Sequence, residues 1–219
     1  MNYRINFRYF KKFKKHADYL IKGIFAGMLI AIGGVAYLSV ENKVAGSFLF
    51  SLGLLTVCMY GMNLYTGKIG YVLINKIDYL YELFIGLLGN FIGAFLVGKL
   101  VLASRIKVIA ETAKTISFIK LNDSLISIFI LSMFCGMIIY IAVNNYKKAS
   151  NEIGKYIGII MGIMVFILCG FEHCVANMFY FTVAGAWSLR TLLYVLIMVL
   201  GNSVGSIVIA WFYNLYYKN

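Results

Sequence analysis

Residues 170–179 read Gly-Phe-Glu-His-Cys-Val-Ala-Asn-Met-Phe and interrupt an apolar stretch that runs from about 154 to 187. A single membrane-spanning helix needs only about 20 residues. Glutamate and histidine at membrane depth are costly unless they line a cavity inside the protein. We therefore expect two short helices with a polar break between them, enclosed in a helix bundle.

A second break is expected earlier in the chain. Residues 45–76 are also too long for one simple helix and carry Tyr65-Thr66-Gly67-Lys68 in their interior. Of the 219 residues, 62% are apolar and 13% are charged, a composition typical of a chain that resides in a bilayer. The apolar segments lie near 23–40, 45–76, 80–104, 124–144, 154–187 and 190–213. The sequence thus predicts an all-α integral membrane protein with six transmembrane helices, the second and fifth interrupted.

A short motif recurs in the two halves of the chain. Residues 89–94 read Gly-Asn-Phe-Ile-Gly-Ala in the third span, and residues 201–206 read Gly-Asn-Ser-Val-Gly-Ser in the sixth. Three spans separate the copies, so the second copy is inverted in the membrane relative to the first. Inverted repeats are typical of transport folds, with substrate sites near broken helices. Small residues at this spacing also allow close helix packing, which is the alternative explanation.

The charges indicate how the chain is oriented. Twenty Lys and Arg against eight Asp and Glu give a net charge of +12. Basic residues crowd the N-terminal arm and the connection after the fourth span, which six spans place on one side. The positive-inside rule makes that side cytoplasmic, so both termini are expected there, and no nucleic-acid partner is expected. A basic cluster on the outer side departs from the rule and would attract anions: Arg105, Lys107, Lys114 and Lys120.

The ends of the chain are short. We expect residues 1–22 to form an amphipathic helix on the cytoplasmic membrane surface, 23–213 the six-helix domain, and 214–219 a cytoplasmic tail. In the arm, aromatic and small residues recur at helical spacing with basic residues between them. These residues are Tyr3, Phe7, Phe10, Phe13 and Ala17.

No cofactor or metal site is expected. The four cysteines lie in apolar segments without a Cys-x-x-Cys pair, which favours core packing over disulfides or zinc. Glu172, His173 and Cys174 are adjacent, and neighbouring residues on a helix point to different faces.

Three features together resemble the formate–nitrite transporter family. The decamer Gly170–Phe179 looks like the signature of the interrupted fifth helix in that family. Leu64-Tyr65-Thr66-Gly67 resembles the loop in its second helix, and Lys120-Leu121, twelve residues before Ser132, matches the position of a lysine ahead of the fourth helix. The resemblance runs from about residue 20 onward. The chain departs from the family in its lack of proline, and in Gly136, where relatives often carry asparagine.

The resemblance implies an aquaporin-like homopentamer with one pore in each protomer. His173 would be the central pore histidine, Thr66 would face it, and Lys120 would make the centre electropositive. Glu172 and Asn177 would hold the broken helix. Two apolar constrictions would flank the centre, an inner one of Leu54, Leu64 and Phe166 and an outer one of Phe50 and Ile139.

The expected function is therefore a channel in the cytoplasmic membrane for small monovalent weak-acid anions. An anion loses hydration in an apolar constriction, and a histidine with an unperturbed pKa of about 6.5 can offer it a hydrogen bond or a proton. The sequence leaves open which of these His173 does, and whether Lys114 replaces Lys120. Formate is the first expected substrate, with hydrosulfide or nitrite as alternatives.

Two other classes of function compete. A neutral-solute channel of the aquaporin kind would carry Asn-Pro-Ala loops, which a chain without proline cannot have. A membrane enzyme that used His173 and Glu172 would need more polar residues on neighbouring spans, so no enzyme is expected. No GxxxxGK[ST] motif is present for an ATP-driven pump.

Overall fold

The computed structural model describes the chain from residue 2 to 217, and its side chains from residue 14 onward. Every regular element in that range is helical, which confirms the predicted fold class. The elements are α1 (Asn2–Leu38), α2 (Lys43–Met59), η1 (Ile69–Ile74), α3 (Asp78–Leu102), η2 (Arg105–Ile109), α4 (Ala110–Leu121), α5 (Leu125–Lys148), α6 (Glu152–Leu168), α7 (Cys174–Ala184) and α8 (Leu189–Tyr217).

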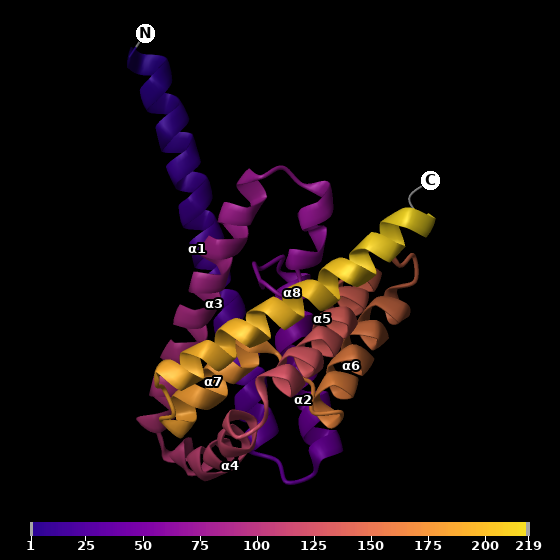
Figure 1. Ribbon diagram of the computed structural model, residues 1–219. Coiled ribbons are helices and arrows are strands. Elements are labelled where there is room, and N and C mark those ends of the chain that lie inside the picture. The colour runs from indigo at the N-terminus through magenta and orange to yellow at the C-terminus, as the bar shows by residue number, and fades with distance from the viewer. Residues whose placement is uncertain (1, 218–219) are drawn as a thin grey trace.

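Within the described part of the chain, four helices are long and apolar enough to cross a membrane: Lys14–Leu38 of α1, and α3, α5 and α8. The other two crossings are each divided into two short helices, α2 with η1 and α6 with α7. The start of α1 and the end of α8 lie on one face of the bundle, here called the termini face (Figure 1).

The same type of backbone turn ends the first helix of each interrupted crossing. Helix α2 ends before Gly61 and α6 before Gly170, and both glycines have positive φ, 62° and 69°. In each case the residue after the glycine donates to a carbonyl five residues earlier, Met62 to Val57 and Phe171 to Phe166, both at 2.9 Å. This is the Schellman arrangement, which glycine favours because it has no Cβ. Both breaks are therefore encoded locally.

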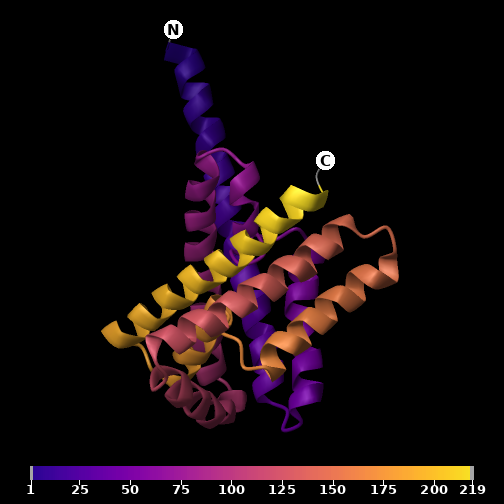
Figure 2. The ribbon, with the colours of Figure 1, turned by 45° about the vertical axis from the view of Figure 1, so that its right-hand side comes forward.

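The repeated motif packs in the same way in each half. A Cβ on Gly27 of α1 would lie 2.1 Å from the Asn90 carbonyl oxygen, and a Cβ on Gly136 of α5 would lie 2.2 Å from that of Asn202. Helix α1 packs on α3, and α5 packs on α8, with backbones in close contact (Figure 2). The motif is thus a packing element and also a marker of the repeat.

Helix α4 has no counterpart among the expected elements. Together with η2 it lies at the face opposite the termini and packs on α7 (Figure 1). Ala113 and Ser117 are its buried residues. Its short apolar face is too weak a periodic signal to distinguish a helix from a loop.

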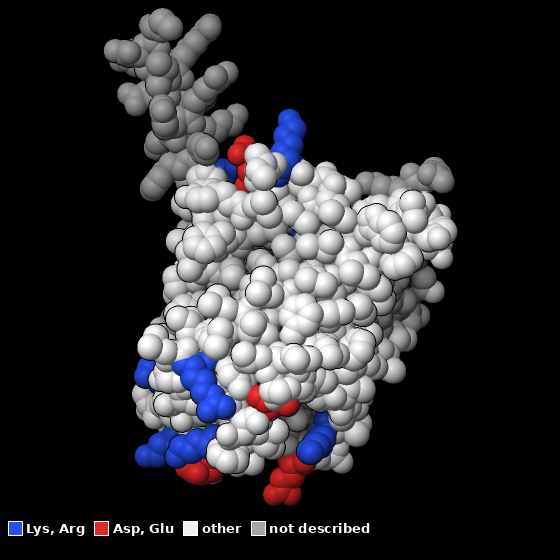
Figure 3. All heavy atoms as spheres, in the orientation of Figure 1, with Lys and Arg blue, Asp and Glu red and all other residues white. Residues whose placement is uncertain are grey.

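On the face shown in Figure 3, charged side chains gather toward the two ends and leave a largely uncharged band between them. Helix α3 carries a stripe of exposed apolar residues at every fourth position: Leu80, Phe84, Leu88, Ile92, Leu96 and Leu100. Such a face fits lipid or a neighbouring subunit.

The basic arm is part of α1, which runs from Asn2 to Leu38 without a break at residue 22. The aromatic side chains expected to face a membrane surface, Tyr3, Phe7, Phe10 and Phe13, lie outside the described side chains. Their orientation stays a prediction.

Candidate pore site

The two interrupted crossings meet at one polar contact. The hydroxyl oxygen Oγ1 of Thr66, in the first break, lies 2.8 Å from Nε2 of His173, in the second. Thr66 is completely buried and His173 is 3% exposed. The structure therefore brings together two expected site residues that are 107 positions apart in the sequence.

Asn90 of α3 holds the first break in place. Its Nδ2 donates to the carbonyl oxygens of Gly23, at 2.8 Å, and Asn63, at 2.9 Å. Its Oδ1 accepts a 2.9 Å hydrogen bond from the backbone N–H of Tyr65. A broken helix leaves backbone N–H groups and carbonyl oxygens without partners. A buried amide side chain can satisfy both, because it carries an acceptor and donors.

Asn202 of α8 does the same for the second break. Its Nδ2 donates to the carbonyl oxygens of Ser132, at 2.8 Å, and Glu172, at 2.7 Å, and its Oδ1 accepts from the N–H of Cys174 at 2.9 Å. The repeated Gly-Asn motif located both asparagines in the sequence. Their role as clamps required the three-dimensional structure, because their partners are up to 70 residues away.

The position of His173 at the start of α7 fixes its tautomer. Its Nδ1 accepts a 3.2 Å hydrogen bond from the backbone N–H of Ala176, so the ring is the N-cap of the helix. In the neutral ring, the nitrogen that accepts has no proton, and the other nitrogen carries it. Nε2–H therefore donates to the Thr66 hydroxyl.

Lys120 and Glu172 form a partly buried ion pair. Lys120 Nζ lies 2.6 Å from Glu172 Oε2, and the two side chains are 14% and 4% exposed. The same oxygen accepts from Asn177 Nδ2 at 2.7 Å. Lys114 instead pairs with Glu111 at 2.8 Å on the exposed side of α4. Of the two candidate lysines, only Lys120 contacts the second break.

This pairing changes how Lys120 can act. The family resemblance implies that Lys120 makes the centre electropositive, but the Glu172 carboxylate offsets its charge at short range. Two residues of α8 fix the connection that follows Lys120. Arg190 donates to the Leu121 carbonyl oxygen at 2.6 Å, and Tyr194 donates to that of Asp123 at 2.7 Å. Arg190 and Tyr194 were not among the expected site residues, because nothing in one sequence links them to this connection.

Apolar side chains surround the Thr66–His173 contact. All five residues expected in the constrictions are at most 4% exposed: Phe50, Leu54, Leu64, Ile139 and Phe166. The Phe166 ring lies 5.7 Å from the His173 ring and packs edge-on against Phe50 at 5.8 Å. Phe166, which was grouped with the inner set, therefore also contacts the outer one.

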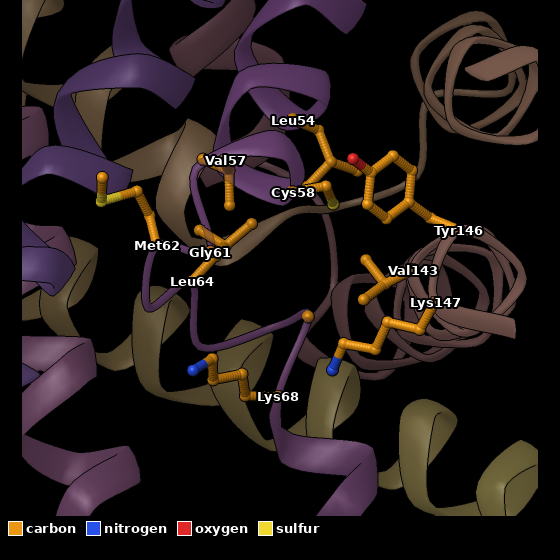
Figure 4. Close-up of a pocket in the computed structure, with 11 residues that line it drawn as sticks. Leu54, Val57, Cys58, Gly61, Met62, Leu64, Lys68, Val143, Tyr146 and Lys147 are labelled. Carbon is orange, nitrogen blue, oxygen red and sulfur yellow. The ribbon is translucent and has the colours of Figure 1, made fainter. Parts of the chain in front are cut away.

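A cavity of about 140 Å³ lies between the second half of α2, the first break and the last turns of α5. Leu54 and Leu64 form part of its wall, and Lys68 and Lys147 lie at its other end (Figure 4). Leu54 and Leu64, both expected in the inner constriction, and Gly67, the neighbour of Thr66, are therefore all part of the cavity wall.

Comparison with known proteins gives consistent results. The model of the formate/nitrite transporter family matches residues 9–216. The formate channel FocA of Haemophilus influenzae is 26% identical over 199 residues, which cover 81% of this chain and 70% of that protein. The formate-nitrite transporter of Plasmodium falciparum is 24% identical, with 78% of this chain and 68% of that protein covered. These relatives are channels or transporters rather than enzymes.

Solved structures support the same fold. A structure described as a pentameric formate channel with formate bound superposes with a TM-score of 0.83, at 24% identity, and covers 94% of this chain and 99% of that one. A structure described as a channel of the FNT family of ion channels gives a TM-score of 0.74 at 19% identity, with 93% and 89% covered.

Proposed function

Because the chain belongs to the formate/nitrite transporter family, we propose that it is a channel that passes small monovalent weak-acid anions, formate first, across the cytoplasmic membrane. The observation that carries the proposal is the Thr66–His173 contact, which joins the two interrupted crossings deep among apolar side chains. Buried polar groups inside a membrane protein are typical of a solute pathway.

The contact offers hydrogen bonds that replace lost water. An anion that enters an apolar constriction gives up hydration, and aliphatic or aromatic walls cannot replace it. The Nε2–H of His173 and the hydroxyl of Thr66 are both donors. A carboxylate at the centre would exchange the bond between these two groups for bonds to its own oxygens. The hydrogen bond between Thr66 and His173 forms again when the anion leaves.

We propose that His173 donates a hydrogen bond and keeps its own charge unchanged. A charged imidazolium carries a proton on both nitrogens. Its Nδ1–H would then face the Ala176 N–H, which now donates to that nitrogen at 3.2 Å. Proton coupling would come from protonation of the weak acid itself.

Lys120 would assist by compensating Glu172. A buried carboxylate next to the centre would repel an anion, and the ammonium group 2.6 Å away offsets that repulsion. Glu172 in turn accepts from Asn177, which also donates to the His173 carbonyl oxygen at 3.1 Å. The pair would therefore both neutralise and support the second break.

Nitrite and hydrosulfide remain alternatives, because both are small monovalent anions that the same donors could bind. Formate is placed first because several similar proteins are described as formate channels. We also propose a homopentamer with a pore in each protomer and with both termini in the cytoplasm. The exposed stripe on α3 and the pentameric solved relative support this assembly.

The test is formate release from liposomes that contain the parent protein or His173→Phe at matched density. The parent should release formate well above protein-free liposomes, and the variant should fall to the protein-free rate, because it removes the donor and fills the centre. Thr112→Ala, an exposed residue of α4, is the control for reconstitution. A parent protein that releases formate no faster than empty liposomes would contradict the proposal.

A further inference from the structure

Two lysines line the cavity beside the first break, and the candidate site described above does not use them. Lys68 follows the first break, and Lys147 is in the last turn of α5. Both line the cavity of about 140 Å³, whose other walls are largely apolar, and their ammonium groups lie at the end away from Leu54 (Figure 4).

Neither lysine has a carboxylate partner among the side chains from residue 14 to 217. Lys68 Nζ donates to Asn63 Oδ1 and lies 5.1 Å from the centre of the Tyr19 ring. Lys147 Nζ lies 3.9 Å from the centre of the Tyr71 ring. Neutral oxygens and aromatic faces hold these cations in place without cancelling their charge.

The acidic groups in range are already paired. Asp18 forms an ion pair with Lys22 at 2.8 Å, and Glu82 forms one with Lys15. The charge that remains at this end of the pore is therefore positive.

The inverted repeat shows how this end differs from the opposite one. Asn90 binds the Asn63 carbonyl oxygen and the Tyr65 N–H, as Asn202 binds the Glu172 carbonyl oxygen and the Cys174 N–H. Asn63 therefore occupies the position that Glu172 has in the other half. Each residue accepts a bond from a lysine, but Glu172 neutralises Lys120, whereas the Asn63 amide leaves Lys68 charged.

From this asymmetry we propose that Lys68 and Lys147 form a second anion-binding site. A small monovalent anion, such as a carboxylate of one or two carbons, would occupy the cavity on the termini side of Leu54 and Leu64. Two cations beside apolar walls are costly without a counter-ion, and an anion there supplies one. The cavity admits a few heavy atoms, which excludes nucleotides and other large phosphorylated solutes.

The site would act as a staging position for the proposed channel. An anion held between the two ammonium groups waits next to the inner constriction, at a raised local concentration. The inference rests on the proposed function for its role in conduction, but anion binding in the cavity can be measured without any flux.

Formate flux through reconstituted protein tests the role of the charges. Lys68→Gln keeps a donor for Asn63 but removes the charge. The variant should raise the half-saturating formate concentration about tenfold, as expected for loss of a charged hydrogen bond. The flux at saturating formate should change less. Lys68→Arg should recover most of the loss, and Lys147→Gln should act in the same direction. Lys76→Gln, an exposed lysine beyond η1, is the matched control and should resemble the parent.

Crystals of the full chain soaked in bromide test the site directly, through anomalous scattering. A bromide peak between Lys68 and Lys147 in the parent, absent in Lys68→Gln, supports the site even if formate does not flow. If the parent conducts formate but shows no bromide peak, and Lys68→Gln leaves the half-saturating formate concentration unchanged, the second site is overturned. The proposed channel function would still stand. An equal shift in Lys76→Gln also overturns the second site, since general surface charge would then explain the effect.

Discussion

The direction of one hydrogen bond limits the chemistry of His173. Its Nδ1 accepts from the Ala176 backbone, so the proton of the neutral ring is on Nε2, next to Thr66. The sequence could predict His173 as a central residue from its surroundings. It could not choose between hydrogen-bond donation and proton transfer, because that choice depends on which nitrogen caps α7.

His173→Asn separates these two roles. Asparagine is a good N-cap and keeps an amide donor, but it does not titrate. We expect formate flux to remain substantial and its pH profile to superimpose on that of the parent. Flux measured against pH in liposomes of matched protein density checks this. Loss of the pH-driven component of uptake would show that the ring transfers a proton.

Lys120 was expected as an electropositive group, and its pairing with Glu172 was not, since the two residues are 52 positions apart. Lys120→Ala would leave a buried carboxylate without its cation, which costs about 3–5 kcal/mol in stability. It would also repel anions at the centre. We expect formate flux to fall at least tenfold, as about 1.4 kcal/mol of added barrier already gives that factor.

Two further variants identify the cause of that loss. Lys120→Ala combined with Glu172→Gln should recover part of the flux, because the unpaired charge is removed. Lys114→Ala should behave as the parent, since Lys114 pairs with Glu111 on the exposed face of α4. If the double variant stays as inactive as Lys120→Ala, the role of Lys120 is not charge compensation.

At the scale of the elements, the two breaks were predictable and the clamps were not. Apolar stretches too long for one helix, each with polar residues inside, are visible along the chain. The Schellman glycines Gly61 and Gly170 are local signals of the same kind. Asn90 and Asn202 work through distant backbone groups, and helix α4 depends on α7 for its burial, so one sequence carries no direct sign of either.

Asn202→Ala tests the clamp on the second break. It removes three hydrogen bonds and leaves two buried carbonyl oxygens and one N–H with fewer partners. Each such group costs about 1–3 kcal/mol, so the melting temperature in detergent should fall clearly, and flux should fall with it. Ser206→Ala, on the same helix, loses one bond to Gly136 and is the control. Equal melting temperatures for both variants would contradict the clamp.

At the scale of the whole molecule, composition and segment length predicted the six crossings and the all-helical fold. The inverted motif predicted the relation between the halves. Because pairing between residues 25 or more positions apart is not encoded locally, the ion pair, the clamps and the contact of Phe166 with Phe50 required the structure.

Assembly is a separate property of the whole molecule. The exposed apolar stripe on α3 gives each protomer a face that a neighbour can cover. Native mass spectrometry of the detergent-purified protein should give a mass of five subunits. A stable monomer or trimer would contradict the proposed pentamer while leaving the pore within each protomer possible.

The most direct test of the anion channel is a solute panel across an imposed pH gradient. Liposomes with the protein would be given formate, nitrite, hydrosulfide, lactate or glycerol, and uptake compared with that of protein-free liposomes. The centre offers donors to an anion between apolar constrictions, so formate uptake should rise with the inward proton gradient and glycerol uptake should stay at the protein-free rate. Glycerol uptake that equals or exceeds formate uptake, whatever the gradient, would contradict the account.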